Sequence, residues 1–366
     1  MRIMITGGGT GGHTSPAVAI IEELRARDPM LAVQWVGCKG GIEERVCAAY
    51  AIPFRPIPTR GWPRKNLLKR AVVGCIVLAG FVRAFFYIKK FRPQVVMGVG
   101  GYVSVPLTWM AQRLGVPTVL HEQNKQLGMA NRVLAVRADR LLLSYPDTLG
   151  DYPDSKACLV GNPVRSGFTN PIDRVAACEK LELDPLIPVV LVCGGSQGAH
   201  TLNQALSDTI SQFTPGTIQF IWMTGNADVV GARAAAAAVD TRVDVHPFID
   251  DMATACAAAT LIVSRAGASS TAELAALGRP SILVPYPHAT DGHQGENARA
   301  FEEAGASLVL LDEACTGERL TDLLRQLIGN PSQLESMSEA AAAQARPVAV
   351  ETIVEEVFSL VMEEAH

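Results

Sequence analysis

Four polar side chains that could bind a ligand are spaced through residues 261–298. They are Arg265, Glu273, Gln294 and Asn297. Apolar runs at 261–263 and 281–284 predict two buried strands, and a helix over 271–277 is expected between them because Gly278 and Pro280 would end it. Parallel sheets bind ligands at the carboxyl ends of their strands, so we expect the four side chains to converge at that edge.

Glu273 has two alternative roles. Ser270-x-x-Glu273 has the spacing of a capping box, in which both side chains satisfy the first turn of a helix without any ligand. Alternatively, the carboxylate accepts hydrogen bonds from a sugar diol while the helix N-terminus faces a phosphate. The spacing alone favours the cap.

A glycine loop at Gly7–Gly12 follows an apolar strand at 1–6 and precedes a helix expected at 15–26. Gly7-x-Gly9-x-x-Gly12 matches the dinucleotide fingerprint, which raises an NAD-binding alternative. That alternative requires an acid at the end of the second strand to hold a ribose, yet 32–36 is followed by Gly37-Cys38-Lys39. No Gly-Lys-Ser/Thr follows either. The loop therefore suits a pyrophosphate but not a nicotinamide cofactor.

The second half of the chain repeats this arrangement. A strand at 189–193, a glycine loop at 194–198 and a helix at 199–210 predict a second Rossmann-like domain. Ser196 and Gln197 add side-chain donors to the backbone N–H groups, as a diphosphate leaving group would need.

Two residues are candidates for a proton acceptor. His13 closes the first glycine loop at the end of a strand, and Glu122 lies in His121–Asn124 after a strand at 118–120. Tyr102 follows another strand, at 94–99. Structural alternatives stay open, because Tyr102 also suits a packed aromatic and Glu122 a helix cap.

Residues 60–92 contain nine Lys and Arg and no acids. Their longest uninterrupted apolar run, 71–82, is too short to span a bilayer, and Arg83 interrupts any extension. The segment is either a domain helix or a helix whose apolar face, including Ile76, lies in an anionic membrane surface. The excess of cations favours the membrane.

Length and charge divide the chain in two. A chain of 366 residues exceeds one ordinary core, and residues 1–162 carry a net charge of +11 against −15 for 163–366. No nucleic-acid motif accompanies the basic half. We expect an N-terminal domain over 1–162, a C-terminal domain over 163–339, and a terminal helix within 340–366 that packs back on the first domain.

Cysteines and acids exclude other classes of protein. Eight cysteines without a C-x-x-C pair suit free thiols in a reducing compartment, and glycines interrupt the N-terminal apolar run too early for a signal peptide. Asp250 and Asp251 invite a metal, but helix capping accounts for them better, and no Asp-x-Asp triplet occurs. No metal or other cofactor is expected.

Six motifs together carry a resemblance to a known family. GGGTGGH at 7–13, GGYVS at 100–104, HEQN at 121–124, GNPVR at 161–165 and GGSQGA at 194–199 precede the segment 261–298. In this order the chain resembles the MurG family of bacterial glycosyltransferases. The resemblance implies an α/β fold of two Rossmann-like domains facing a central cleft, the GT-B type. It also implies an inverting hexosyltransferase that moves N-acetylglucosamine from UDP-GlcNAc to the 4-hydroxyl of undecaprenyl-pyrophosphoryl-MurNAc-pentapeptide in peptidoglycan synthesis.

The resemblance also assigns roles to residues. Catalysis falls to His13 and Glu122, and acceptor or membrane contacts to Tyr102, Asn131, Ile76 and Arg83. The donor site comprises Thr10, Gly11, Gly12, Asn124, Arg165, Ser196, Gln197, Gly198, Phe248, Ile249, Arg265, Ala268, Glu273, Gln294 and Asn297. The chain departs from some relatives at His293, which is given no role.

The implied partners are UDP-GlcNAc, the lipid-linked acceptor, an anionic membrane surface and other cell-envelope synthesis proteins. The implied location is the cytoplasmic face of the inner membrane, as a peripheral protein. Three alternatives remain: a UDP-GlcNAc 2-epimerase, another GT-B glycosyltransferase, and a non-catalytic sensor of sugar nucleotides.

Overall fold

The computed structural model describes all residues except 10, 62–66, 196–197, 290–291 and 364–366. The chain forms two compact units, Met1–Arg165 with Val348–His366, and Ser166–Pro347. The first boundary was expected at 162/163 and the returning segment from residue 340, so the observed unit 1 extends three residues further and its second segment begins later, at Val348.

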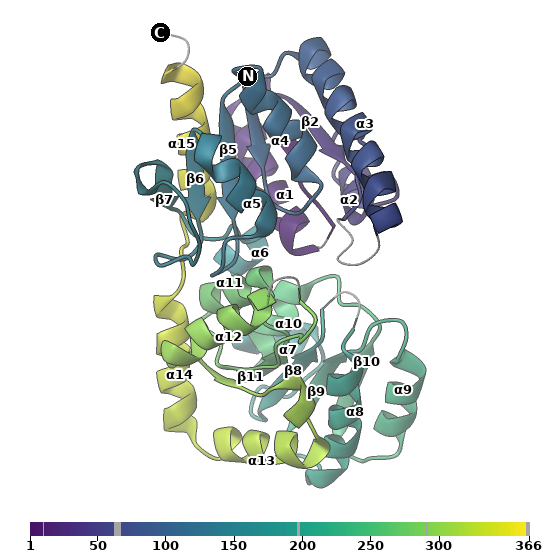
Figure 1. Ribbon diagram of the computed structural model, residues 1–366. Coiled ribbons are helices and arrows are strands. Elements are labelled where there is room, and N and C mark those ends of the chain that lie inside the picture. Colours follow the sequence, from purple (N-terminus) through teal and green to yellow (C-terminus); the bar gives the residue numbers. More distant parts are fainter. Residues whose placement is uncertain (10, 62–66, 196–197, 290–291, 364–366) are drawn as a thin grey trace. The chain divides into compact units, whose positions relative to one another are not determined.

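Unit 1 is built on a seven-stranded parallel sheet with the order β3-β2-β1-β4-β5-β6-β7. Its strands are β1 (Arg2–Thr6), β2 (Ala32–Gly37), β3 (Phe54–Pro56), β4 (Val95–Gly98), β5 (Thr118–Glu122), β6 (Arg140–Leu143) and β7 (Ala157–Leu159). The helices are α1 (Gly11–Arg27), α2 (Ile42–Ala49), α3 (Leu67–Phe91), α4 (Ser104–Arg113), α5 (Met129–Leu134) and α15 (Ala349–Glu363). The central strands are apolar on both faces because helices cover both sides of the sheet (Figure 1).

Unit 2 repeats the plan with six parallel strands in the order β10-β9-β8-β11-β12-β13. They are β8 (Val189–Cys193), β9 (Gln219–Met223), β10 (Arg242–His246), β11 (Leu261–Ser264), β12 (Ser281–Leu283) and β13 (Ser307–Val309). The helices are α6 (Ser166–Thr169), α7 (Arg174–Lys180), α8 (His200–Thr209), α9 (Val229–Ala237), α10 (Met252–Ala258), α11 (Ala268–Ala276), α12 (His293–Glu303), α13 (Gly317–Ile328) and α14 (Pro331–Ala343). The predicted strand at 189–193 is found with the expected bounds.

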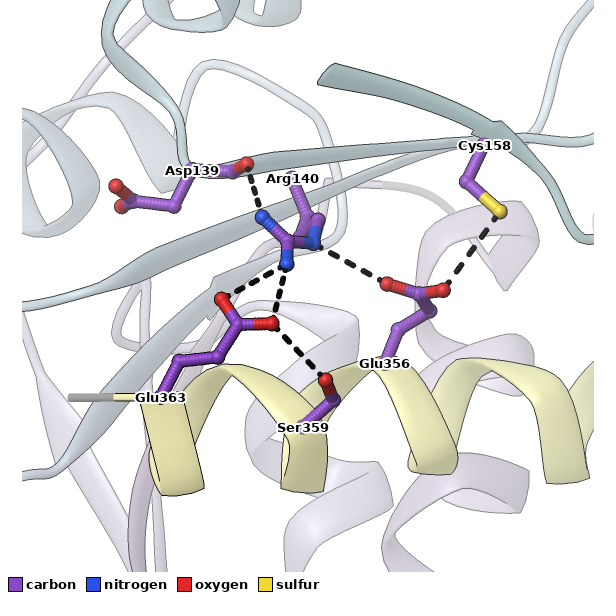
Figure 2. A network of polar contacts seen from close by, with 6 residues as sticks. All are labelled: Asp139, Arg140, Cys158, Glu356, Ser359 and Glu363. Carbon is purple, nitrogen blue, oxygen red and sulfur yellow. Dashed lines mark hydrogen bonds and ion pairs between the residues drawn. The ribbon is translucent and has the colours of Figure 1, made fainter. Parts of the chain in front are cut away.

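The C-terminal helix α15 belongs to unit 1, where it packs beside α1. Ile353, Val354, Val357 and Leu360 follow helical spacing and are buried in the same core as β1. Arg140 on β6 fixes the polar side of the helix (Figure 2). Its Nε donates to Glu356 at 3.2 Å and its Nη2 to Glu363 at 2.8 Å.

Candidate active site

His13 lies in the first turn of α1, because this helix begins at Gly11 rather than at the predicted residue 15. Its imidazole is half-buried, and Nδ1 lies 3.0 Å from Oε1 of Gln123. Gly100 and Gly101 pass close to the ring with φ of +93° and +79°. A Cβ at Gly100 would lie 3.0 Å from Nδ1 of His13, so only glycine gives both this backbone shape and this clearance.

Glu43, on α2, is a buried acid that sequence analysis missed. Its carboxylate accepts hydrogen bonds from the Gly9 N–H at 3.3 Å and the Cys38 N–H at 2.8 Å, with no exposure to solvent. A side chain at Gly8 would collide with the same carboxylate. Glu43 is not the acid that the NAD-binding alternative requires at the end of β2: it comes from the next helix and occupies the inner side of the first glycine loop. A phosphate on this inner side of Gly8 and Gly9 would meet the Glu43 carboxylate, and pyrophosphate binding by the rest of the loop stays a prediction.

Glu122, at the end of β5, is 2% exposed and accepts four hydrogen bonds. Oε1 accepts from the backbone N–H and the side-chain amide of Asn124, at 3.1 and 3.0 Å. Oε2 accepts from the Gly128 N–H at 2.8 Å and the Asn131 amide at 2.9 Å. A carboxylate engaged by four donors fixes the turn into α5 and has little capacity for a substrate proton. This arrangement favours the structural alternative for Glu122, and its catalytic role stays a prediction.

The other unit 1 residues differ in accessibility. Tyr102 is 44% exposed beside the first glycine loop, and burial of its ring raises the pKa of its phenol. Asn124 and Asn131 are buried around Glu122, whereas the Arg165 side chain is half-buried at the end of the unit. Tyr102 is therefore the most accessible of the predicted acceptor contacts on this face.

Arg265 follows β11 and binds the ends of the neighbouring strands. Its Nη1 donates to the Val284 carbonyl at 3.1 Å and to Asp312 Oδ1 at 2.5 Å, and its guanidinium lies 5.4 Å from the centre of the Tyr286 ring. Asp312 also accepts from Thr201 on α8 at 3.2 Å. Arg265 is thus a buried cation at the carboxyl edge of the sheet, already held by one carboxylate.

Glu273 does not form the predicted capping box. Helix α11 begins at Ala268 with Gly267 at its N-cap, so Ser270 lies inside the first turn and Glu273 in the middle of the helix. The spacing misled because the helix begins three residues earlier than expected. Glu273 instead lies near Cys193 at the end of β8; burial, and secondarily this carboxylate, raise the pKa of that thiol to about 12. This position beside the second glycine loop fits the ligand-binding alternative.

The remaining donor-site predictions fall into three groups. Gln294 Oε1 accepts from the Tyr286 N–H at 2.9 Å and holds α12 to the segment after β12, whereas Asn297 is buried and donates to the Ala266 carbonyl at 3.2 Å, after β11. Phe248 is exposed, Ile249 and Gly198 are half-buried, Ala268 opens α11, and Gly11 and Gly12 open α1. Thr10, Ser196 and Gln197 lie outside the described residues.

Asp251 caps α10, as the sequence indicated. It accepts from the Thr254 N–H at 3.2 Å and from Lys180 Nζ at 2.7 Å. The Lys180 hydrogen bond is the first cause that lowers the pKa of Asp251 to about 2. Within the described part of the chain, no group of three or more His, Cys, Asp or Glu could hold a metal ion.

Family models match both halves of the chain. Residues 3–143 match the glycosyltransferase family 28 N-terminal domain, and residues 189–353 match the C-terminal domain of the same family. Two similar known proteins are both named UDP-N-acetylglucosamine–N-acetylmuramyl-(pentapeptide) pyrophosphoryl-undecaprenol N-acetylglucosamine transferase. The relative from Exiguobacterium sp. is 39% identical over 98% of this chain and 100% of its own length. The relative from Phocaeicola vulgatus is 38% identical over 98% and 96%.

Solved structures agree on the fold. The crystal structure of Acinetobacter baumannii MurG covers 98% of this chain and 99% of its own, with a TM-score of 0.78 and 28% identity. A Neisseria meningitidis UDP-GlcNAc 2-epimerase has a TM-score of 0.67 at 15% identity, which indicates a shared fold alone. The two duplicated sheets, the matched domains and the full-length relatives agree: the chain belongs to glycosyltransferase family 28, in its MurG family of bacterial N-acetylglucosaminyltransferases.

Proposed function

We propose that this hexosyltransferase moves N-acetylglucosamine from UDP-GlcNAc to the 4-hydroxyl of undecaprenyl-pyrophosphoryl-MurNAc-pentapeptide, with inversion at the anomeric carbon. The observation that carries the proposal is the match of 39% identity along the whole of a relative with this name. The structure supplies residues suited to the task in each unit: an imidazole beside the strand ends of unit 1, and a cation and a carboxylate beside those of unit 2.

The chemistry assigned to unit 1 is proton removal. The acceptor hydroxyl attacks the anomeric carbon from the face opposite UDP, a C–O bond forms, and the bond to UDP breaks with its electron pair. His13 takes the hydroxyl proton, because its half-buried ring lies at the mouth of the first glycine loop whereas Glu122 is saturated with donors.

The chemistry assigned to unit 2 is donor binding. The diphosphate gains negative charge as it leaves, and the Arg265 guanidinium and the N-terminus of α11 are positive groups at the sheet edge where it would lie. Glu273 would accept hydrogen bonds from the ribose hydroxyls. This chemistry uses no metal, so we propose that transfer proceeds without one.

The test is transfer of labelled N-acetylglucosamine from UDP-GlcNAc to a short-chain lipid-linked MurNAc-pentapeptide, with a chelator present. We expect a labelled disaccharide lipid and free UDP. Conversion of UDP-GlcNAc to its 2-epimer, still linked to UDP and without labelled lipid, would support the epimerase instead. Intact binding of UDP-GlcNAc without any turnover would support the sensor.

Glu273→Gln tests the donor site. Since Glu273 lies in mid-helix and does not cap α11, the change should leave the free energy of unfolding within about 0.5 kcal/mol, as for ordinary surface changes. The KM for UDP-GlcNAc should rise while the KM for the acceptor stays constant. Glu296→Gln, on the partly exposed side of α12, is the matched control. An unchanged donor KM would remove Glu273 from the ribose site.

Helix α3 carries the proposed membrane contact. Among the described residues it is the one helix that is apolar and long enough to cross a bilayer. Core helices of soluble proteins can meet the same criteria of length and composition, but they are mostly buried. Only 22% of the apolar window of α3 is buried. One side packs in unit 1, where Ala84 and Ile88 are buried and Phe81 contacts Trp109 edge-on, with ring centres 4.9 Å apart. A helix held on one side by its own domain suits a position along a membrane surface rather than across it.

The other side of α3 is exposed and apolar, with a fringe of cations. Val72, Leu78, Val82 and Phe86 are each more than half exposed. Arg83, Lys89 and Lys90 are exposed on the same helix, which contains no acid. Ile76, the residue named from sequence, is only half-buried and is a less direct probe. We propose that this surface lies in the anionic cytoplasmic leaflet, each cation adding about 1 kcal/mol of attraction.

Vesicle sedimentation tests the membrane contact. Replacing Leu78 and Phe86 by Asp should abolish binding to vesicles that contain anionic lipid, while Leu186→Asp, which changes a 91% exposed leucine of unit 2, should leave binding intact. Raising the salt concentration should weaken wild-type binding. Equal binding by all three proteins would refute the role of α3 without affecting the transferase assignment.

A further inference from the structure

A chain of buried hydrogen bonds connects His13 to the backbone of unit 1. Nδ1 of His13 lies 3.0 Å from Oε1 of Gln123. Nε2 of Gln123 lies 3.0 Å from the Val99 carbonyl and 3.0 Å from Nδ1 of His121. Nε2 of His121 lies 3.0 Å from the Gly161 carbonyl. This series of hydrogen bonds therefore runs from the loop after β7, through the end of β5, to the first turn of α1.

Two carbonyl groups determine the direction of every hydrogen bond in this chain. The Gly161 carbonyl can only accept, so Nε2 of His121 carries a proton and Nδ1 of His121 is an acceptor. The Val99 carbonyl likewise requires a donor, which places the amide NH₂ of Gln123 toward it and toward His121. The opposite amide orientation would bring two carbonyl oxygens together at 3.0 Å. The oxygen of Gln123 therefore faces His13 and can only accept.

We propose that Gln123 is a positioning residue that keeps His13 in the tautomer with the proton on Nδ1, so that Nε2 presents its lone pair to the substrate. In water, neutral histidine prefers the opposite tautomer, which would offer an N–H group to the attacking hydroxyl. Among the described residues Nε2 of His13 has no hydrogen-bond partner. The meaning of this tautomer for catalysis rests on the proposed function; the tautomer itself does not.

Burial keeps the side chains of Gln123 and His121 uncharged and fixed in these hydrogen bonds. Gln123 is 1% exposed and His121 is fully buried, so water cannot replace either partner. Burial lowers the pKa of His121 to about 4, which keeps its Nδ1 unprotonated and able to accept from Gln123. Protonated His121 would direct two N–H groups at each other.

Nitrogen NMR of protein labelled with ¹⁵N-histidine tests the tautomer directly. At about pH 8.5, two units above the ordinary histidine pKa, long-range couplings distinguish a protonated from an unprotonated ring nitrogen. His13→Gln assigns the His13 signal among the seven histidines. We expect a protonated Nδ1 and an unprotonated Nε2 in the wild type. A proton on Nε2 in the wild type overturns the proposal, whatever reaction the protein catalyses.

Gln123→Met tests the cause, since methionine has similar length but no amide. We expect the proton of His13 to move largely to Nε2 and kcat to fall at least tenfold, given that general-base catalysis contributes about 10²–10⁴-fold, with both KM values within about twofold. Gln112→Met is the matched control, because Gln112 donates to the Leu134 carbonyl at 2.9 Å in the same unit without contact to His13. A Gln123→Met protein that keeps the wild-type tautomer refutes the role of Gln123.

Discussion

Replacing Glu122 by Gln separates a structural anchor from a catalytic base. The carboxylate accepts from Asn124 at one oxygen and from Gly128 and Asn131 at the other. A glutamine has one acceptor oxygen and one NH₂ group, so in either orientation the NH₂ faces two donors. Two buried donors lose their acceptor, and each such loss costs about 1–3 kcal/mol. We expect Glu122→Gln to reduce the free energy of unfolding by about 2–6 kcal/mol.

Calorimetry together with steady-state kinetics decides between the two roles. For a unit of this size, each kcal/mol lowers Tm by about 2–4 °C, so the transition of unit 1 should move by about 10 °C. His13→Gln, at a half-buried side chain, serves as the control that should lose activity at nearly unchanged Tm. If Glu122→Gln instead keeps the wild-type Tm while kcat falls about 10²–10⁴-fold, Glu122 is the base and the anchoring argument fails.

Three further predictions test packing, charge and thiol reactivity. A maleimide should modify Cys75 first, because it is the one exposed cysteine of the eight, and anionic vesicles should protect it if α3 lies in the membrane; equal labelling with and without vesicles would contradict that contact. Asp251→Ala should cost about 1 kcal/mol at pH 7 through loss of the cap. The folded-state pKa of Asp251 is lowered to about 2, so the cap stabilises the fold fully above about pH 4 and loses this effect as pH falls toward 2. The free energies of unfolding of variant and wild type, measured by urea titration, should therefore converge near pH 2. Arg140→Ala should lower the free energy of unfolding by about 1–2 kcal/mol, a value that allows for the partly exposed carboxylates it pairs with, and should speed hydrogen exchange in α15. Unchanged exchange would show that apolar packing alone holds the helix.

Apolar patterns were enough to predict the two parallel sheets. Runs such as 189–193 are buried on both faces, so their composition marks a central strand without knowledge of its neighbours. The terminal helix expected within 340–366 corresponds to α15, whose buried residues lie in the core of unit 1. Its polar clamp was not predictable, because Arg140 lies more than 200 residues before Glu356 and Glu363.

Helix starts and carboxylate roles were the parts that sequence could not give. The Ser270–Glu273 spacing suits a capping box, but the backbone begins its helix at Ala268, and nothing local distinguishes these alternatives. Glu122 has the residue type of a base, and its role depends on four donors that only the folded turn assembles. The sequence therefore located the strand ends approximately, since β5 runs to Glu122 rather than to residue 120, whereas the state of each side chain there required tertiary structure.

The two glycine loops differ in the charges that lie near them. Both follow the first strand of a duplicated domain, but the first loop receives the Glu43 carboxylate on its inner side. A phosphate placed against Gly8 and Gly9 would meet a buried negative charge, and such repulsion is strong where water is excluded. In the second loop, the described residues leave open space around the Cβ position of Gly195, and Arg265 supplies a cation at the same sheet edge. This difference supports the proposed diphosphate site in unit 2, although residues 1–162 carry the positive net charge, and the exposed Arg83, Lys89 and Lys90 of α3 suit the proposed membrane contact.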